Sequence, residues 1–432
     1  MPFTVGIYTL GCKVNQYESE AIAESLENEG FVICDAASVC DLYVINTCTV
    51  TAESDRKSRQ FIRRAISENP DAKIIVTGCL AQTKPEELTK IKGVCYVCGS
   101  RNKMSVVDAA KKLFFTHDEF PSINVPETSS LGFECMTIKK FPRTRAYIKI
   151  EDGCESHCTY CIIPRARGKI CSKPPRDVLS ELEALADDGC REVVLTGIET
   201  ASYGIDFDNY RIADLLCDAD SIAKGRMRIR LGSLDPSLMK PRFVERIADL
   251  TSLAPHFHLS MQSGSDRVLA NMKRKYNTKM AYDGICALRE AIPDVQFTTD
   301  IITAFPGESE EDFANTRAFL EKVRFLNAHI FTYSRRDGTL AASMPDQIPS
   351  STGKARTNSL ISVQKEITDA LLTEQAGRVF PVLFETDANG YSYGHTPSFI
   401  EVKVRSDKEL HSQIRNVRII SAMDGVAIGT LE

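Results

Sequence analysis

Three closely spaced cysteines have the right type and spacing to hold a metal cluster. Cys154, Cys158 and Cys161 are separated by three and by two residues. Three thiolates on one loop can bind three irons of a cubane cluster and leave the fourth iron without a protein ligand. Because a catalytic metal needs an open position, this pattern favours a reactive cluster. The alternative is zinc, with His157 or Cys171 as the fourth ligand, although no second Cys-x2-Cys pair lies nearby.

Three further cysteines share one position relative to predicted strands. Cys12, Cys48 and Cys79 each follow a short β-rich run. In an open parallel sheet, the carboxyl ends of the strands converge on one crevice. Three thiols brought there could hold a second cluster, again with one open iron, although cysteine is also buried as a small hydrophobe. The three runs are Val5–Thr9, Leu42–Thr47 and Ile74–Thr77.

Three segments with different patterns of predicted strands and helices would position these cysteines. Residues 1–115 alternate β-rich and helical runs, which predicts an open parallel α/β sheet, and residues 116–140 carry loop signals. Residues 141–371 contain six β/α units, which predict a partial (β/α)6 barrel, two units short of a closed one. Residues 372–432 contain β-rich runs between turn signals and predict a small β-barrel. The six strands predicted in the middle segment are Ala146–Ile150, Glu192–Thr196, Arg226–Leu231, His256–Met261, Gln296–Ile302 and Ala328–Tyr333.

Composition excludes several classes of protein. The chain has 15 cysteines, 43% hydrophobic residues and 26% charged residues, so it is not mostly disordered. No apolar run approaches the ~18 residues of a membrane helix, and the first residues lack the basic and apolar regions of a signal peptide. We therefore expect a cytoplasmic protein without a membrane partner, whose thiols are metal ligands or buried side chains instead of disulfides.

Charge is distributed unevenly along the chain. The formal net charge is −5, but residues 139–176 hold 10 Lys and Arg against three acids. The stretch Arg267–Lys279 adds Lys273, Arg274 and Lys275 without any acid. A basic mouth around a reactive loop suits a phosphate-rich substrate such as RNA, whereas a single basic run can also be an ordinary solvated surface.

The loop around Cys154 resembles that of the radical S-adenosylmethionine (SAM) enzymes. Their Cys-x3-Cys-x-aromatic-Cys motif matches Cys154, Cys158, Tyr160 and Cys161. The resemblance implies that the open iron chelates SAM and that an electron from the cluster cleaves SAM to a 5′-deoxyadenosyl radical. It also places Tyr160 against the adenine, whereas the residue type alone equally fits an aromatic that plugs the barrel mouth.

The chain as a whole resembles the methylthiotransferase family, whose members insert a methylthio group into an unactivated C–H bond. The resemblance implies an N-terminal methylthiotransferase domain over 1–115, a linker over 116–140, a radical SAM core over 141–371 and a TRAM domain over 372–432. It also implies two 4Fe-4S clusters. Their ligands are Cys12, Cys48 and Cys79 for the auxiliary cluster, and Cys154, Cys158 and Cys161 for the SAM-cleaving cluster.

Three substrate types compete within this family. MiaB-like enzymes act on isopentenyladenosine, RimO-like enzymes on a ribosomal-protein aspartate and MtaB-like enzymes on N6-threonylcarbamoyladenosine. Five segments of the chain look like the MtaB type. Two departures from the family pattern, at Ile302–Gly307 and at Gly232, lie near the expected SAM site and put individual SAM contacts in question. The MtaB-like segments are Leu10–Glu18, Asn46–Thr51, Cys161–Gly168, Leu195–Ile198 and Ser202–Gly204.

The resemblance implies a reaction that uses two SAM molecules. One methylates a sulfur on the auxiliary cluster, and the other yields the radical that activates carbon 2 of the modified adenosine at position 37 of a tRNA. Further SAM contacts are expected from residues that face the barrel top, although strand-end polar residues often simply cap helices. These residues are Thr196, Gly197, Ser233, Gln262 and Asp300.

The implied partners are the anticodon loop of a tRNA, an electron donor such as a flavodoxin or ferredoxin, and a sulfur source, with the protein itself a monomer. In the tail, Tyr391, Tyr393, His395 and Phe399 fit either base stacking or a barrel core. Two other classes stay open from the residues alone: a two-cluster electron carrier, and an RNA-binding module with structural zinc. Metal analysis separates them, because two cubanes require about eight irons per chain.

Overall fold

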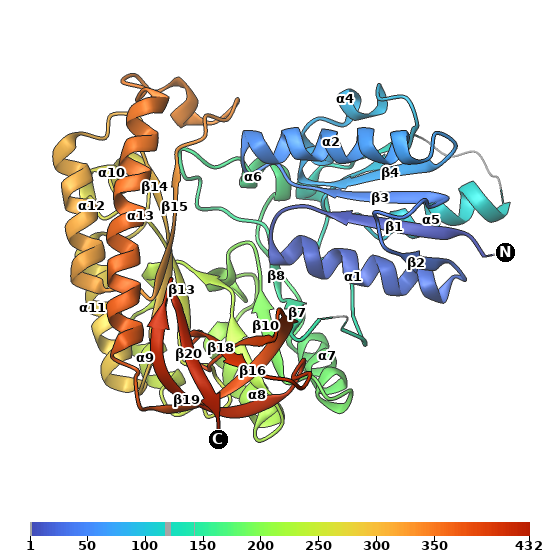
Figure 1. Ribbon diagram of the computed structural model, residues 1–432. Helices are drawn as coiled ribbons and strands as arrows, with labels where there is room; N and C mark the ends of the chain where they lie inside the picture. The colour runs from blue at the N-terminus through green and yellow to red at the C-terminus, as the bar shows by residue number, and fades with distance from the viewer. Residues whose placement is uncertain (1, 117–121, 142) are drawn as a thin grey trace.

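The N-terminal unit is a six-stranded parallel sheet. The structure is a computed structural model that describes residues 2–116, 122–141 and 143–432. The strand order is β2-β1-β3-β4-β5-β6, and every neighbouring pair is parallel (Figure 1). Its elements are β1 (Thr4–Thr9), α1 (Lys13–Asn28), β2 (Val32–Cys34), β3 (Leu42–Thr47), α2 (Ala52–Glu68), β4 (Lys73–Gly78), α3 (Cys79–Thr83), α4 (Pro85–Thr89), β5 (Val94–Cys98), α5 (Ser105–Lys111) and β6 (Ile123–Asn124).

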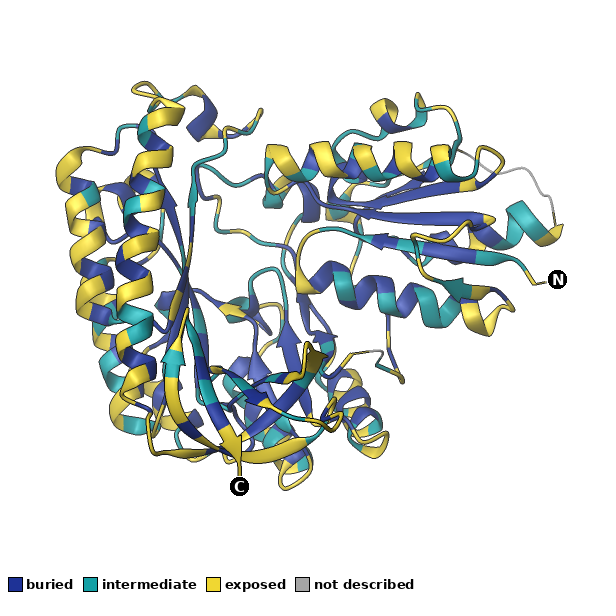
Figure 2. Cartoon of the chain, viewed as in Figure 1, coloured by how far each residue is buried: buried dark blue, intermediate teal, exposed yellow. Residues whose placement is uncertain are grey.

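Helices cover both faces of this sheet, which explains why its central strands are continuous apolar runs. Ile22 of α1 packs against one face, and Ile62 of α2 packs against the other. Figure 2 shows the strands buried between the two helix layers, whose outer surfaces are exposed. The segment predicted as a connector contributes β6, which pairs with β5 and extends the sheet by one strand.

The middle unit is the predicted partial barrel, in which two short strands, β11 and β12, together take the place of the third of the six predicted strands. Two sheets form it, with strand orders β11-β10-β7 and β12-β13-β14-β15, and only Gly232 separates β11 from β12. Its strands are β7 (Ala146–Lys149), β10 (Glu192–Thr196), β11 (Arg228–Leu231), β12 (Ser233–Leu234), β13 (His256–Gln262), β14 (Gln296–Thr303) and β15 (Asn327–Thr332). The helices are α6 (Ile163–Arg167), α7 (Pro175–Asp187), α8 (Ile212–Ala223), α9 (Pro241–Ile247), α10 (Asp266–Asn271), α11 (Thr278–Ala291), α12 (Glu310–Val323) and α13 (Ser350–Thr373). A short antiparallel pair, β8 (Glu151–Asp152) and β9 (Cys171–Ser172), flanks the cysteine loop.

The C-terminal unit is a closed five-stranded barrel, consistent with a TRAM domain. Its strands are β16 (Val379–Ala388), β17 (Tyr391–His395), β18 (Glu401–Arg405), β19 (Ile414–Met423) and β20 (Val426–Leu431). The predicted fold class is therefore confirmed in all three parts. Within the described residues, no helix is both long enough and apolar enough to cross a bilayer.

Candidate active site

The three cysteines of the auxiliary triad (Cys12, Cys48 and Cys79) meet at the carboxyl end of the first sheet. Cys12 is the N-cap of α1, Cys48 follows β3 and Cys79 is the first residue of α3. Burial, together with the neighbouring thiols of Cys79 and Cys12, raises the pKa of the Cys48 thiol to about 11. Influence of this kind requires the three thiols to lie within electrostatic range of one another.

The second triad (Cys154, Cys158 and Cys161) lies on the loop between β8 and α6. Burial raises the pKa values of Cys154 and Cys161 to about 12. The thiol of Cys154 donates a hydrogen bond to Oε2 of Glu199 at 3.5 Å and accepts one from the backbone N–H of Ser156 at 3.4 Å. Without metal the thiols of Cys154 and Cys161 are protonated at neutral pH, so formation of a cluster there has to release protons.

Each triad places one thiol against a guanidinium from elsewhere in the chain. Nε of Arg167 donates to Sγ of Cys79 at 3.2 Å, and Nη1 of Arg274 donates to Sγ of Cys158 at 3.1 Å. A fixed positive charge stabilises a thiolate, so both triads suit an anionic thiolate-bound cluster. In the part of the chain that is described, no three His, Cys, Asp or Glu side chains surround a single ion. A cubane differs from a single-ion site because each thiolate binds a different iron.

The residues predicted to contact SAM lie at or near the mouth of the partial barrel. Thr196 ends β10, Gln262 ends β13 with a left-handed backbone (φ +65°), and Ser233 begins β12. Gly197 directly follows β10. Tyr160 packs beside a small apolar cluster that includes Val268, Met272 and Phe305.

Asp300 on β14 is the predicted SAM contact most fully engaged by the protein itself. Nε2 of His258 lies 3.1 Å from one carboxylate oxygen, and Nδ1 of His329 lies 3.4 Å from the other. Burial raises the pKa of Asp300, but the two imidazoles outweigh it and hold the pKa well below its usual range. Asp300 thus lies in the barrel as predicted, with histidine partners that the sequence did not reveal.

Comparison with known proteins agrees with this geometry. Residues 4–99 match the model described as Uncharacterized protein family UPF0004, and residues 148–320 match the Radical SAM superfamily. The Bacillus subtilis (strain 168) protein named Threonylcarbamoyladenosine tRNA methylthiotransferase MtaB is 37% identical over 97% of this chain and 94% of its own length. A Thermotoga maritima protein of the same name is 38% identical over 88% of this chain and 86% of its own length. A Desulfitobacterium hafniense (strain Y51) protein named tRNA-2-methylthio-N(6)-dimethylallyladenosine synthase is 35% identical over 89% of this chain and 87% of its own length.

The chain belongs to the radical SAM methylthiotransferases that act on tRNA. Within them it is of the MtaB type, and it uses SAM and an iron–sulfur cluster. The radical SAM methyltransferase TsrM from Kitasatospora setae has a similar fold, with a TM-score of 0.60 at 16% identity over 79% of this chain and 77% of that chain.

The basic residues predicted to line the mouth of this methylthiotransferase divide into two groups. Lys149, Arg167 and Lys173 are buried and bind carboxylates, so they form internal ion pairs and the predicted basic mouth is wrong for them. Arg145 and Arg274 are only partly exposed and are ion-paired as well, Arg145 with Glu192 and Glu385 and Arg274 with Asp235. The exposed basic residues are Lys139, Lys140, Arg143, Arg165, Lys169, Arg176, Lys273 and Lys275.

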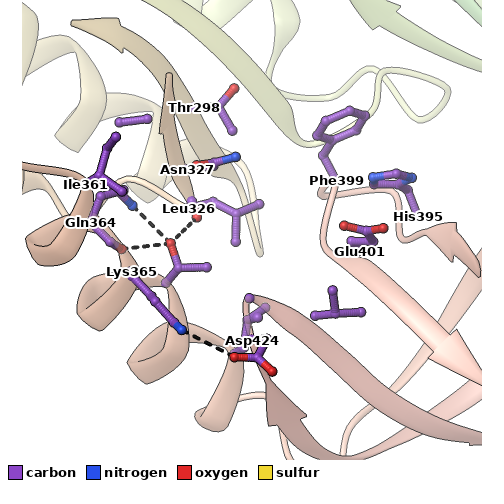
Figure 3. A pocket seen from close by; sticks show the side chains of 15 residues that line it. Thr298, Leu326, Asn327, Ile361, Gln364, Lys365, His395, Phe399, Glu401 and Asp424 are labelled. Carbon is purple, nitrogen blue, oxygen red and sulfur yellow. Dashed lines mark hydrogen bonds and ion pairs between the residues drawn. The ribbon is translucent and has the colours of Figure 1, made fainter. Parts of the chain in front are cut away.

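Two of the tail aromatics lie in the junction between the barrel core and the C-terminal domain. Phe399 stacks between His256 of β13 and His395, with ring centroids 4.6 and 4.5 Å away. The guanidinium of Arg230 lies 4.8 Å from the same ring. Phe399 and His395 line a cavity of about 440 Å³. Figure 3 shows them across from lining residues of α13 and β15, such as Gln364 and Asn327. None of the six triad cysteines lines this cavity, so it belongs to the junction and not to the reaction centre.

Proposed function

We propose that this enzyme methylthiolates carbon 2 of N6-threonylcarbamoyladenosine at position 37 of a tRNA, using two SAM molecules. The observation that carries the proposal is the pair of cysteine triads, one at the strand ends of each α/β unit, on a chain related to proteins named for this activity. The cluster held by Cys154, Cys158 and Cys161 would supply the electron for SAM cleavage, and a second cluster on the auxiliary triad would supply the sulfur.

The chain's own residues orient these groups. Arg274 binds Cys158 and is itself fixed by Asp235, whose Oδ2 accepts Nη2 at 2.7 Å. The carboxylate of Glu199 accepts hydrogen bonds from the thiol of Cys154 and from the hydroxyl of Ser156. Glu199 lies on the loop after β10, and the cysteines lie on the loop after β8. The loop after β10 thereby fixes the position of the cysteine loop.

Lys13 supports the choice of nucleoside. It directly follows Cys12, keeps contact with solvent, and pairs with no carboxylate of the described chain. Desolvation and Arg230 lower the pKa of Lys13, whereas Asp300 of β14 raises it, so the ammonium is within electrostatic range of charged residues of the barrel. N6-threonylcarbamoyladenosine carries a carboxylate that this ammonium can bind, whereas isopentenyladenosine carries an apolar group.

A basic groove beside the auxiliary triad supports tRNA as the macromolecule. The groove has a volume of about 390 Å³ and runs between α2 and the loop after β15. Arg336 on that loop binds Thr49 and Asp55 at 2.7 and 3.0 Å, next to Cys48. Its basic lining residues are Arg56, Arg59, Arg63, Lys84, Arg335 and Arg336.

The substrate is tested by mass spectrometry of tRNA nucleosides after anaerobic turnover. We expect the 2-methylthio product from tRNA with N6-threonylcarbamoyladenosine and little or none from tRNA with isopentenyladenosine. Lys13→Gln should reduce the first reaction and leave any second one unchanged. Equal product from both tRNAs would overturn the proposed choice of nucleoside. About four irons per wild-type chain instead of about eight would overturn the proposal of a second cluster.

A further inference from the structure

Arg167 joins the auxiliary triad to the radical SAM core. It ends α6, the helix after the loop of the second triad, and its side chain is fully buried. Nε donates to Sγ of Cys79 at 3.2 Å, and Nη2 donates to Asn15 at 2.6 Å. Nη1 donates to Glu18 at 2.7 Å and to Asp152 at 3.1 Å. One guanidinium therefore holds the auxiliary domain through three residues and the core through one.

The ion-pair network around this guanidinium contains more cations than carboxylates. Lys103, Lys149 and Arg167 face only Glu18 and Asp152, and all five side chains are almost completely buried. The three cations hold the pKa of Glu18 well below its usual range although burial raises it, so Glu18 is ionised. An uncompensated buried charge is strongly destabilising in general. The edge of Arg167 that carries no carboxylate faces the triad thiol.

An anionic cluster on the auxiliary triad would supply the missing negative charge. Three thiolates on a cubane with one open iron carry excess negative charge, and hydrogen bonds to the sulfurs stabilise the reduced form most. We propose that Arg167 is a positioning residue for the auxiliary cluster. Its guanidinium binds the thiolate of Cys79 and thereby raises the reduction potential of that cluster. This proposal rests on the second cluster of the proposed function.

A purely structural role for Arg167 is the competing explanation, because the same side chain docks the two domains. Lys149 provides a matched control. Its ammonium pairs with the same two carboxylates, at 2.7 Å from Glu18 and 2.6 Å from Asp152, but it contacts no triad cysteine. Removal of either cation takes the same charge out of the same network, and only one removal also breaks a bond to sulfur.

The test measures the auxiliary cluster alone, in the full-length chain without the second triad. The parent is the variant with Cys154→Ala, Cys158→Ala and Cys161→Ala. Arg167→Met, Arg167→Lys and Lys149→Met are added to it singly. The midpoint potential of the remaining cluster is then measured by reductive titration with electron paramagnetic resonance detection.

We expect Arg167→Met to shift the midpoint to a more negative potential than Lys149→Met does. Arg167→Lys should shift it in the same direction by less, because the charge stays while the bond to Cys79 is lost. An unchanged potential in both Arg167 variants, or an equal shift in Lys149→Met, would overturn the role of Arg167. If the Arg167→Met variant holds no iron, the potential of the Arg167→Lys variant, compared with that of the parent, decides whether Arg167 has the proposed role. A parent without iron would overturn the second cluster itself, which distinguishes that failure from failure at Arg167.

Discussion

At the scale of single residues, the cysteines were predictable and their cationic partners were not. Ligand type and spacing are local properties, so the sequence reveals both triads directly. Arg167 and Arg274 reach their thiols from 88 and 116 residues away, and no local pattern marks such a pairing. The sequence marks Arg167 only as one cation of a basic run, within the Cys161–Gly168 segment that resembles the family.

The two triads should have separable functions. Cys154→Ala is expected to abolish formation of 5′-deoxyadenosine from SAM, because the cluster that would bind SAM loses one of its three protein ligands. Cys12→Ala should leave that cleavage largely intact and remove the methylthio product. Both products are measured by mass spectrometry after anaerobic turnover, with Cys95→Ala on β5 as a cysteine variant outside both triads. Methylthiolation at the normal rate by the Cys12→Ala enzyme would contradict the sulfur-donor role.

Glu20 on α1 should make stability depend on pH. Burial raises the pKa of Glu20 from 4.5 to about 7, and the Arg143 guanidinium at 3.4 Å does not offset it. The folded chain then binds more protons than the unfolded chain between those two values, so stability falls as pH rises through that window. Glu20→Gln should gain up to about 3 kcal/mol at pH 8 and almost nothing at pH 4.5.

Thermal unfolding of the full chain at both pH values checks this expectation. The control Glu27→Gln changes an exposed carboxyl on the same helix and should alter stability by no more than about 0.5 kcal/mol. A gain for Glu20→Gln that is equal at both pH values would show that its effect is unrelated to ionisation.

At the scale of elements, the auxiliary triad depends on where strands pass into helices. The sequence predicts these strand ends because apolar β-rich runs stop just before each cysteine. How closely the turns approach one another was not predictable, since it depends on strands that are distant in sequence. Gly11 has φ +100°, and a Cβ there would lie 2.8 Å from Cβ of Cys48.

Gly11→Ala should therefore displace Cys48 and reduce bound iron from about eight to about four per chain. Gly30 offers the matched control, because it has φ +90° and open space around its absent Cβ. Each alanine should cost roughly 1–3 kcal/mol through backbone strain alone. Iron analysis and thermal unfolding distinguish the two effects. Equal iron in both variants would mean that the contact with Cys48 does not matter for the cluster.

At the scale of the whole molecule, charged pairs between distant segments assemble the three units. Arg336 binds Asp55 across 281 residues, and Arg145 binds Glu385 of the C-terminal barrel across 240 residues at 2.5 Å. The sequence predicts each unit from its own periodicity, but it shows Arg145 only as one charge of a basic stretch and gives no signal for the pairing of Arg336. Residues 139–176 carry a net charge of +7, from 10 basic and three acidic residues. Part of this positive charge is neutralised by ion pairs within the protein, so tRNA must contact the basic residues that remain exposed.

The groove beside α2 is where we expect that contact to be strongest. Arg63 and Arg335 are exposed on its two walls and have no ion-pair partner among the described residues. Arg63→Glu combined with Arg335→Glu should weaken tRNA binding by at least roughly tenfold and reduce its salt dependence, because phosphate contacts release counterions. SAM cleavage without tRNA should not change.

Binding is measured by filter retention at several salt concentrations. The control reverses two exposed basic residues of the core at a separate cavity, Lys240→Glu with Arg242→Glu, so the change in net charge is the same. If both double variants lose the same affinity, tRNA responds to overall charge instead of to this groove. If only the groove variant loses affinity, the substrate approaches the enzyme over Cys48, where the auxiliary triad meets the loop after β15.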